Sequence, residues 1–374
     1  MDELIRFRQE LHRYPELSGH ERGTGKRIRF FLNKYRPHTL HTDIEGEGMA
    51  AVFNGTEAGP TLVFRCDLDA LPIHETENKP HRSTVPGVSH ASGHDGHIAM
   101  VTGLSKIIIE NPIKRGRAIL LYQPEEENGE GALKTFRWLR EHDLLPDYAF
   151  AIHNIPRFPL GSVIVSRNVF AAASKGLIVK LYGVSSHAAY PEHGVNPSPA
   201  MSEIIQGLTG ICSGGGFSDF TLITVIHLKL GEVVFGASPG YGEIGATLRA
   251  FKDADMKKLT EDALQLIGSI GDKYNLQIET TFGDEFPVTI NDANLTDLIE
   301  KLAAENGKQV VEINKPNRWS DGFAQFTVRG PAILIGLGLG EETPHLSTSE
   351  FDFPDEALQH GVDIYNAIIS HYLR

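Results

Sequence analysis

The sequence predicts an α/β protein in which a doubly wound, mostly parallel sheet forms the larger domain and a ferredoxin-like α+β domain is inserted into it. Three observations predict this fold. The 374 residues are too many for one compact core, which favours two domains. Short apolar runs alternate with helical patterns up to about residue 174. From there the order becomes strand, helix, strand, strand, helix, strand, which is typical of ferredoxin-like domains.

The elements of the larger domain follow from the spacing of apolar residues. Helical spacing predicts a helix over 2–13, which Pro15 ends, and a second helix through 28–32. Apolar runs then predict buried strands, with helices between them. The strands are 49–53, 61–65, 118–121 and 148–152, and the helices are 98–109 and 131–140. A last strand within 330–340 and a closing helix over 355–372 complete this domain.

The inserted domain is predicted over residues 175–286. Its strands are expected at 176–182, 222–230, 243–251 and 276–281. The helix 199–211 has Pro199 in its first turn, and the helix 253–274 has an acidic start. We therefore assign residues 1–174 and 287–374 to the larger domain and residues 175–286 to the inserted domain.

Composition excludes several classes of function. The net charge is −13 and no long basic run occurs, which argues against nucleic acid and anionic membranes as partners. The two cysteines, Cys66 and Cys212, form no disulfide framework, which fits a reducing compartment. The first residues lack the apolar core of a signal peptide, and no apolar run approaches the roughly 18 residues of a membrane span. We expect a cytoplasmic protein.

Three short polar stretches lie at or after the ends of predicted strands. They are His90–His97 with three histidines, Gln123–Glu127 with three consecutive glutamates, and His153-Asn154. Taken singly, a histidine or an acidic loop is more often structural or solvated. Because parallel strands end at one edge of a doubly wound sheet, we expect these side chains to converge. Imidazoles and carboxylates hold catalytic divalent metals, so the stretches predict metal-assisted hydrolysis.

The ordered motifs resemble the co-catalytic metallopeptidase family M20, in particular its amidohydrolase branch (subfamily D) of hippurate, N-acyl-amino-acid and indole-acetyl-amino-acid hydrolases. The resemblance covers essentially the whole chain. The matching segments are Arg8–Glu16, Arg65–Pro72, His90–His97, Gln123–Glu127, His153-Asn154, Ser186–Ala188 and Phe351–Ala357. The family pairs a metal-binding catalytic domain with an inserted lid and dimerisation domain. The resemblance therefore implies these roles for the two predicted domains.

The resemblance implies a role for each matching residue of the catalytic domain. His94, Glu127 and His153 resemble metal ligands. Glu126 resembles the general base that activates a metal-bound water. Asp95 is expected to orient a ligand histidine without itself binding the metal. The implied cofactor is a divalent metal, zinc or manganese.

Two residues of the inserted domain also match functional positions. His187 resembles a residue that reaches the active site of the partner subunit and steadies the oxyanion. Arg249 resembles a lid arginine that binds the carboxylate of a small N-acyl amino acid substrate. The resemblance further implies a homodimer formed through this domain, to which the apolar strand 222–226 and the helix 199–211 would contribute.

The sequence departs from the family pattern at four functional positions. Ser92 replaces the cysteine whose thiolate bridges two metals. Near the C-terminus, Ser347 falls at the position of a ligand histidine, and His345 would serve instead if the loop shifts by two residues. Gly236–Pro239 and Ser320–Phe323 differ from the family's lid and C-terminal segments.

Two functions stay open at this point. The first is a metal-dependent amidohydrolase that cleaves an N-acyl amino acid or a related small amide with Glu126 as the base. It would bind one metal, or two if further ligands complete a second site. The second is a relative with a degraded metal site that binds a carboxylated or acylated small molecule without hydrolysis, or runs a metal-independent reaction in the same pocket.

Overall fold

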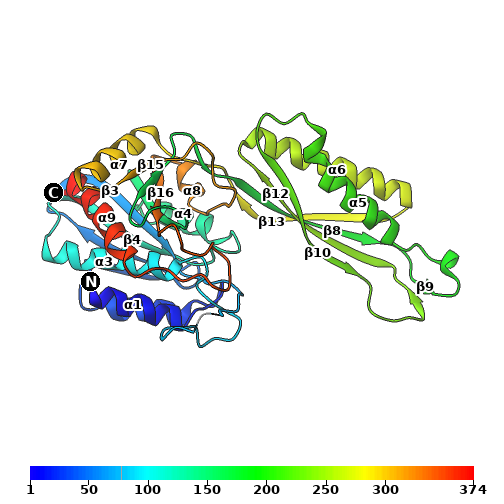
Figure 1. Cartoon of the computed structure of the whole chain (residues 1–374), viewed down its shortest axis with the longest axis horizontal. Helices are drawn as coiled ribbons and strands as arrows, with labels where there is room; N and C mark the ends of the chain where they lie inside the picture. Colours follow the sequence, from blue (N-terminus) through cyan, green and yellow to red (C-terminus); the bar gives the residue numbers. More distant parts are fainter. Residues whose placement is uncertain (77) are drawn as a thin grey trace. The chain divides into compact units, whose positions relative to one another are not determined.

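The computed structural model describes residues 1–76 and 78–374, which divide into two compact units (Figure 1). The first unit contains residues 1–170, 289–315 and 321–374. The second contains residues 171–288 and the short segment 316–320. Sequence patterning placed that short segment in the larger domain.

An eight-stranded sheet forms the centre of the first unit. Its spatial order is β1 (Thr39–Ile44), β2 (Gly48–Asn54), β4 (Arg115–Gln123), β3 (Glu57–Asp67), β5 (Tyr148–Ile155), β16 (Ala332–Gly338), β6 (Val163–Val165) and β15 (Val310–Glu312). The strands β4, β3, β5 and β16 run parallel, whereas β1 and β2 add an antiparallel edge. The predicted α/β class with a mostly parallel sheet is confirmed.

Helices on both faces cover this sheet, as the buried apolar residues of its central strands require. These helices are α1 (Asp2–Arg13), α2 (Arg22–Leu32), α3 (His94–Glu110), α4 (Gly131–Glu141), α7 (Ala293–Glu305), α8 (Ala324–Thr327) and α9 (Ala357–Leu373). Helices α3 and α9 pack on β3 and β4, and α1 packs on α3. Helix α4 contacts β4 and α8. Helix α1 thus reaches the interior, where it buries Arg8 and His12 as well as apolar residues.

The strand register brings the predicted polar stretches to one edge of the sheet. Asp67, the last residue of β3, pairs with Gln123, the last residue of β4. Strand β5 lies beside β3 in parallel. Helix α3 begins directly at His94, after Gly93 with a left-handed φ of 84°. A Cβ at Gly93 would lie 2.6 Å from Oδ1 of Asn154, so only glycine fits this turn.

The second unit has the predicted strand and helix order. Its elements are β8 (Ala173–Tyr182), α5 (Ser198–Ile211), β10 (Thr221–Leu230), β12 (Tyr241–Ala250), α6 (Asp253–Tyr274) and β13 (Gln277–Phe286). The four strands form an antiparallel sheet in the order β10-β12-β8-β13. Helices α5 and α6 pack on each other and on β10 and β12. The ferredoxin-like architecture is therefore confirmed.

Short elements complete the chain. They are β7 (Val169–Ala171), β9 (Ser186–His187), β11 (Ala237–Ser238) and β14 (Thr289–Ile290), with β9 paired to β11. Within the described ranges, no helix is both long enough and apolar enough to cross a bilayer.

Candidate metal centre and active site

The candidate site lies where β3, β4 and β5 end and α3 begins. Three predicted residues meet there: one ligand atom each of His94, Glu126 and Glu127 lie within 4.8 Å of one another. Nε2 of His94 is 3.9 Å from Oε1 of Glu127. The backbone N–H of Glu127 donates to Oδ2 of Asp69 at 2.9 Å, which ties the loop after β4 to the loop after β3.

His94 is oriented by the loop after β3. Its Nδ1 donates to the backbone carbonyl of Asp69 at 2.8 Å, so the neutral ring carries its lone pair on Nε2, towards Glu127. Burial lowers the pKa of His94, but the hydrogen bond to Asp69 and the charges of Asp67 and Glu127 outweigh this and raise it well above its usual range. The surroundings of His94 therefore favour a positive charge.

Asp95 has a different position from the one expected. Its carboxylate accepts hydrogen bonds from Nδ1 of His12 at 2.8 Å and from Nη1 of Arg8 at 3.2 Å. The orienting contact to His94 comes from Asp69 instead. The reason is geometric: consecutive residues at the start of a helix point about 100° apart, so Asp95 faces α1 while His94 faces the strand ends.

Asp67, His94 and His97 form a second group of ligand atoms within 4.8 Å. Both additional side chains already have partners. Asp67 forms an ion pair with Arg65 at 2.5 Å, and Nε2 of His97 shares a short hydrogen bond with Oδ1 of Asn154. A cation here would share Asp67 with a buried arginine. The group of His94, Glu126 and Glu127 is therefore the better candidate for a metal.

Glu126 is held in place by a backbone hydrogen bond. Its Oε1 accepts the backbone N–H of Gly322 at 2.9 Å. Burial, followed by the charges of Asp321, Asp67 and Glu127, raises the pKa of Glu126 well above its usual range. A carboxylate whose protonated form is favoured in this way can take a proton from water and keep it until a leaving group needs it.

The charge balance of the site fits a divalent cation. Five buried or half-buried carboxylates surround His94: Asp67, Asp69, Glu126, Glu127 and Asp321. Arg65 is the fully buried cation that pairs with Asp67 and Asp321. One arginine leaves this cluster with an excess of negative charge, and oxygen and imidazole donors together suit zinc or manganese.

His153 lies on β5, with only 8% of its surface exposed. Its Nδ1 donates to the carbonyl of Asn154 at 3.0 Å, and burial lowers its pKa to about 4. Both facts favour the neutral ring that a metal ligand requires. Its ring centre is 5.0 Å from that of His97. His153 does not belong to the 4.8 Å group of described residues around His94 and Glu127, so its role as a ligand stays a prediction.

The two substituted positions have different surroundings. Oγ of Ser92 donates to Oε1 of Glu127 at 2.6 Å. Ser347 has a left-handed φ of 58°, and its backbone N–H donates to the carbonyl of Ala91 at 2.9 Å. The side chains of Ser347 and His345 are exposed, and neither belongs to the groups of ligand atoms found among the described residues. Ligation by His345 or Ser92 remains a prediction.

The two predicted residues of the second unit have contacts of their own. His187 is exposed on β9, and its Nδ1 accepts the N–H of Ala189 at 3.1 Å. Nη1 of Arg249 donates to the carbonyl of Arg318 and to Oγ of Ser320, both at 3.0 Å, and burial lowers the pKa of Arg249. The segment 316–320 thus fixes the direction of this guanidinium.

Sequence patterning gave no role to several residues of this site. Asp67 closes β3, Asp69 lies in the loop that follows, Arg65 precedes both, and Asp321 accepts from Arg65 at 2.8 Å. A signal was present, because two aspartates at and just after the end of the apolar run 62–64 are costly to bury without a cation. Asp321 carried no such local signal.

Comparisons with known proteins agree with this geometry. The sequence model of peptidase family M20/M25/M40 matches residues 63–371, which is well over half of the chain. The chain belongs to this family. Its relatives include the N-acetylcysteine deacetylase of Bacillus subtilis, 29% identical over 95% of this chain and 93% of that protein. An IAA-amino acid hydrolase of Arabidopsis thaliana is 29% identical over 100% of this chain and 86% of that protein.

Solved structures of other proteins have the same fold. A protein of methicillin-resistant Staphylococcus aureus superposes with a TM-score of 0.85 at 24% identity, covering 100% of this chain and 97% of that one. The YXEP protein of Bacillus subtilis, described as a dinuclear metal-binding M20 peptidase, superposes with a TM-score of 0.80 at 25% identity, covering 98% and 96%.

Proposed function

We propose that this M20 protein hydrolyses the amide bond of an N-acyl amino acid, with a divalent metal, zinc or manganese, at the end of the parallel strands. The observation that carries the proposal is the cluster of His94, Glu126 and Glu127 within 4.8 Å, around which carboxylates are in excess. The names of the relatives support the substrate class, since one deacetylates N-acetylcysteine, one N-acetyldiaminopimelate, and one hydrolyses IAA-amino acids.

Three side chains would hold the metal: His94, Glu127 and His153. When bound, a divalent metal polarises the amide carbonyl and makes water more acidic. Oε1 of Glu126 is fixed by the N–H of Gly322, so Oε2 is the atom that accepts the proton of the attacking water. Glu126 would then deliver that proton to the departing amine nitrogen.

The second unit would complete substrate binding as a lid. Arg249, which Arg318 and Ser320 hold in place, would bind the carboxylate of the amino acid. His187 would donate a hydrogen bond to the oxyanion in the active site of the partner subunit.

Homodimerisation through the second unit belongs to the same proposal. Strand β10 is an edge of its sheet and exposes Ile226 by 65%, Leu228 by 53% and Leu230 by 41%. Among the residues that the structure describes, no further strand pairs with the outer edge of β10, and an exposed apolar edge strand favours pairing with a second copy. We expect light scattering at micromolar concentration to give the mass of a dimer, and a strict monomer would contradict this part of the proposal.

Ser92 favours one metal over two. A cysteine thiolate at this position would offer a negatively charged bridge, whereas the hydroxyl of Ser92 donates its hydrogen to Glu127, a predicted ligand. Because this hydrogen bond engages a predicted ligand, it also favours the alternative function, binding of a carboxylated or acylated small molecule without turnover. Metal analysis of the purified protein after zinc or manganese reconstitution tests this: one equivalent supports our assignment, and none favours the alternative.

The experiment that tests hydrolysis uses Glu126→Gln. A panel of N-acetyl, N-benzoyl and indole-acetyl amino acids is assayed with added zinc or manganese. We expect turnover in the wild type and a loss of about 10²–10⁴-fold in kcat in the variant, with metal content retained. Glu130→Gln is the matched control, because Glu130 lies in the same loop but is exposed and pairs with Lys134. Turnover that survives in Glu126→Gln would refute the role of Glu126.

A further inference from the structure

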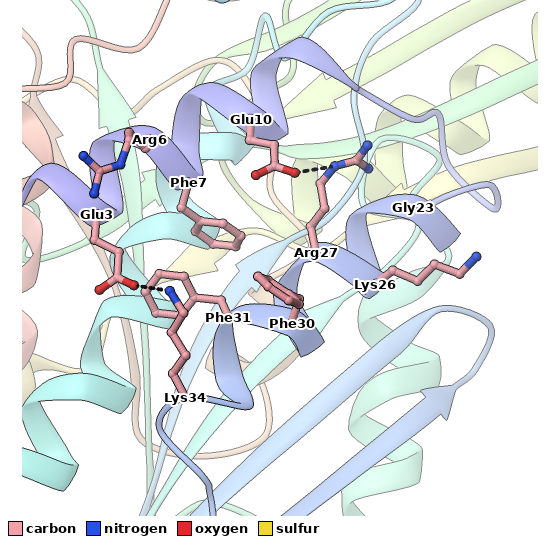
Figure 2. A pocket seen from close by; sticks show the side chains of 10 residues that line it. All are labelled: Glu3, Arg6, Phe7, Glu10, Gly23, Lys26, Arg27, Phe30, Phe31 and Lys34. Atoms are coloured by element: carbon pink, nitrogen blue, oxygen red, sulfur yellow. Dashed lines mark hydrogen bonds and ion pairs between the residues drawn. The ribbon is translucent and has the colours of Figure 1, made fainter.

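A groove of about 550 Å³ lies between α1 and α2 on the first unit, lined by residues of these two helices and by Lys34, just after α2 (Figure 2). This volume falls within the range of pockets that hold small organic ligands. None of the residues proposed above for catalysis or metal binding lines it. The groove is therefore a separate feature that hydrolysis does not explain.

Aromatic side chains form the apolar part of the groove. Phe7 of α1 and Phe31 of α2 are buried against each other, with ring centres 4.8 Å apart. Beside them Phe30 is 72% exposed, although it is a large apolar residue on an ordered helix. Figure 2 shows these three rings together with the ion pairs Glu3–Lys34 and Glu10–Arg27. A flat apolar group laid in the groove would cover Phe30.

The charge of the groove is positive, in a chain whose net charge is −13. Its four cations are Arg6, Lys26, Arg27 and Lys34, and its two acids are Glu3 and Glu10. Both acids are already paired: Glu3 with Lys34 at 2.6 Å, and Glu10 with Arg27 at 3.6 Å. Within the described part of the chain, Arg6 and Lys26 have no acidic partner. Two exposed cations thus remain for an anion.

We propose that this groove binds a small organic anion, a carboxylate carried on a flat apolar group. The apolar part would stack on Phe30 and Phe31, beside the cations of the groove. Arg6 or Lys26 would pair with the carboxylate. Charge complementarity selects an anion over a neutral aromatic ligand, because the groove holds four cations against two acids. The volume selects a small molecule over a folded partner.

Isothermal titration with 2-naphthoate tests the proposal on the full chain. The uncharged 2-naphthamide is the matched probe, because it keeps the apolar group and lacks the charge. We expect naphthoate to bind and naphthamide to bind at least about tenfold more weakly. The double variant Arg6→Gln/Lys26→Gln should lose about tenfold in naphthoate affinity, and Phe30→Ala a similar factor. All three positions are exposed on their helices, so the variants should fold, which thermal unfolding checks.

Two controls separate this groove from other sites. Lys257→Gln removes an exposed lysine of the second unit and should leave binding unchanged. Arg249→Gln should also leave it unchanged, since Arg249 is proposed for the substrate. Hydrolysis of N-acyl amino acids should be the same in Arg6→Gln/Lys26→Gln as in the wild type, so failure here is distinct from failure of the proposed function. Equal naphthoate affinity in the wild type and the double variant, or loss of binding in Arg249→Gln, would overturn the proposal.

Discussion

Replacing His12 with glutamine should remove a pH-dependent part of the stability of the first unit. His12 is fully buried on α1, where its Nδ1 lies 2.8 Å from Oδ2 of Asp95 and its Nε2 lies 3.3 Å from Oε1 of Glu75. Burial lowers the pKa of His12, but these two carboxylates outweigh it and raise the pKa from 6.5 to about 9. The folded protein therefore binds this proton more tightly than the unfolded chain does.

The size and direction of the effect follow from this shift. The stabilisation is complete below pH 6.5, where His12 is protonated in both states, and it is lost as the pH rises through about 9. A shift from 6.5 to about 9 corresponds to about 3 kcal/mol of unfolding free energy. The neighbouring acids do not titrate in this window, since cations beside Asp95 and Asp352 lower their pKa against the effect of burial. Arg8 keeps its charge throughout.

Urea unfolding of the wild type and of His12→Gln at about pH 6 and about pH 10 measures the effect. The wild type should lose about 3 kcal/mol more than the variant between the two pH values. Comparing the two proteins removes the titration of groups that they share. His142→Gln is the control, because His142 is exposed at the end of α4. A difference between wild type and His12→Gln that is equal at both pH values would refute this reasoning.

Three further outcomes are expected. Gly93→Ala should lower the unfolding free energy by about 1–3 kcal/mol and reduce metal content, because its φ is 84° and its Cβ would clash with Asn154; urea unfolding and metal analysis check this. Arg65→Met should cost about 3–5 kcal/mol, since it leaves two buried carboxylates without their cation, whereas Arg167→Met on the surface should change unfolding little. Leu228→Glu, on the exposed edge strand β10, should shift the mass in light scattering from dimer to monomer while leaving thermal unfolding of the chain cooperative.

The strands of the central sheet were predictable where several buried apolar residues follow one another in the sequence. The predicted strands 49–53, 61–65 and 118–121 each contain at least three consecutive apolar residues, and each lies within a strand of the structure. Apolar spacing predicted no strand at β1 or β15, whose residues are mostly half-exposed at the two edges of the sheet. Edge strands carry no continuous apolar run, so their pairing depends on neighbours that are distant in sequence.

The sequence predicted those residues of the site whose polar side chains follow the end of a strand. It did not predict the contacts that backbone atoms make. The convergence of His94, Glu126 and Glu127 followed from parallel strands that end at one edge. The carbonyl of Asp69 that orients His94 and the N–H of Gly322 that fixes Glu126 have no sequence signature, because every residue carries the same groups. The expectation for Asp95 failed for a related reason: adjacency in sequence does not give a shared direction on a helix.

Ser92 bears on how many metals the proposed site of this M20 protein would bind. Its hydroxyl can donate a hydrogen bond, which a thiolate cannot, and at 2.6 Å it donates to the carboxylate expected to ligate. This contact orients Glu127 and withdraws one of its lone pairs from a bridging role. Glu126, whose Oε1 is fixed by Gly322, does not depend on Ser92. Under the proposed function, the substitution would therefore affect a second metal rather than the base, and one-metal hydrolysis agrees with both hydrogen bonds.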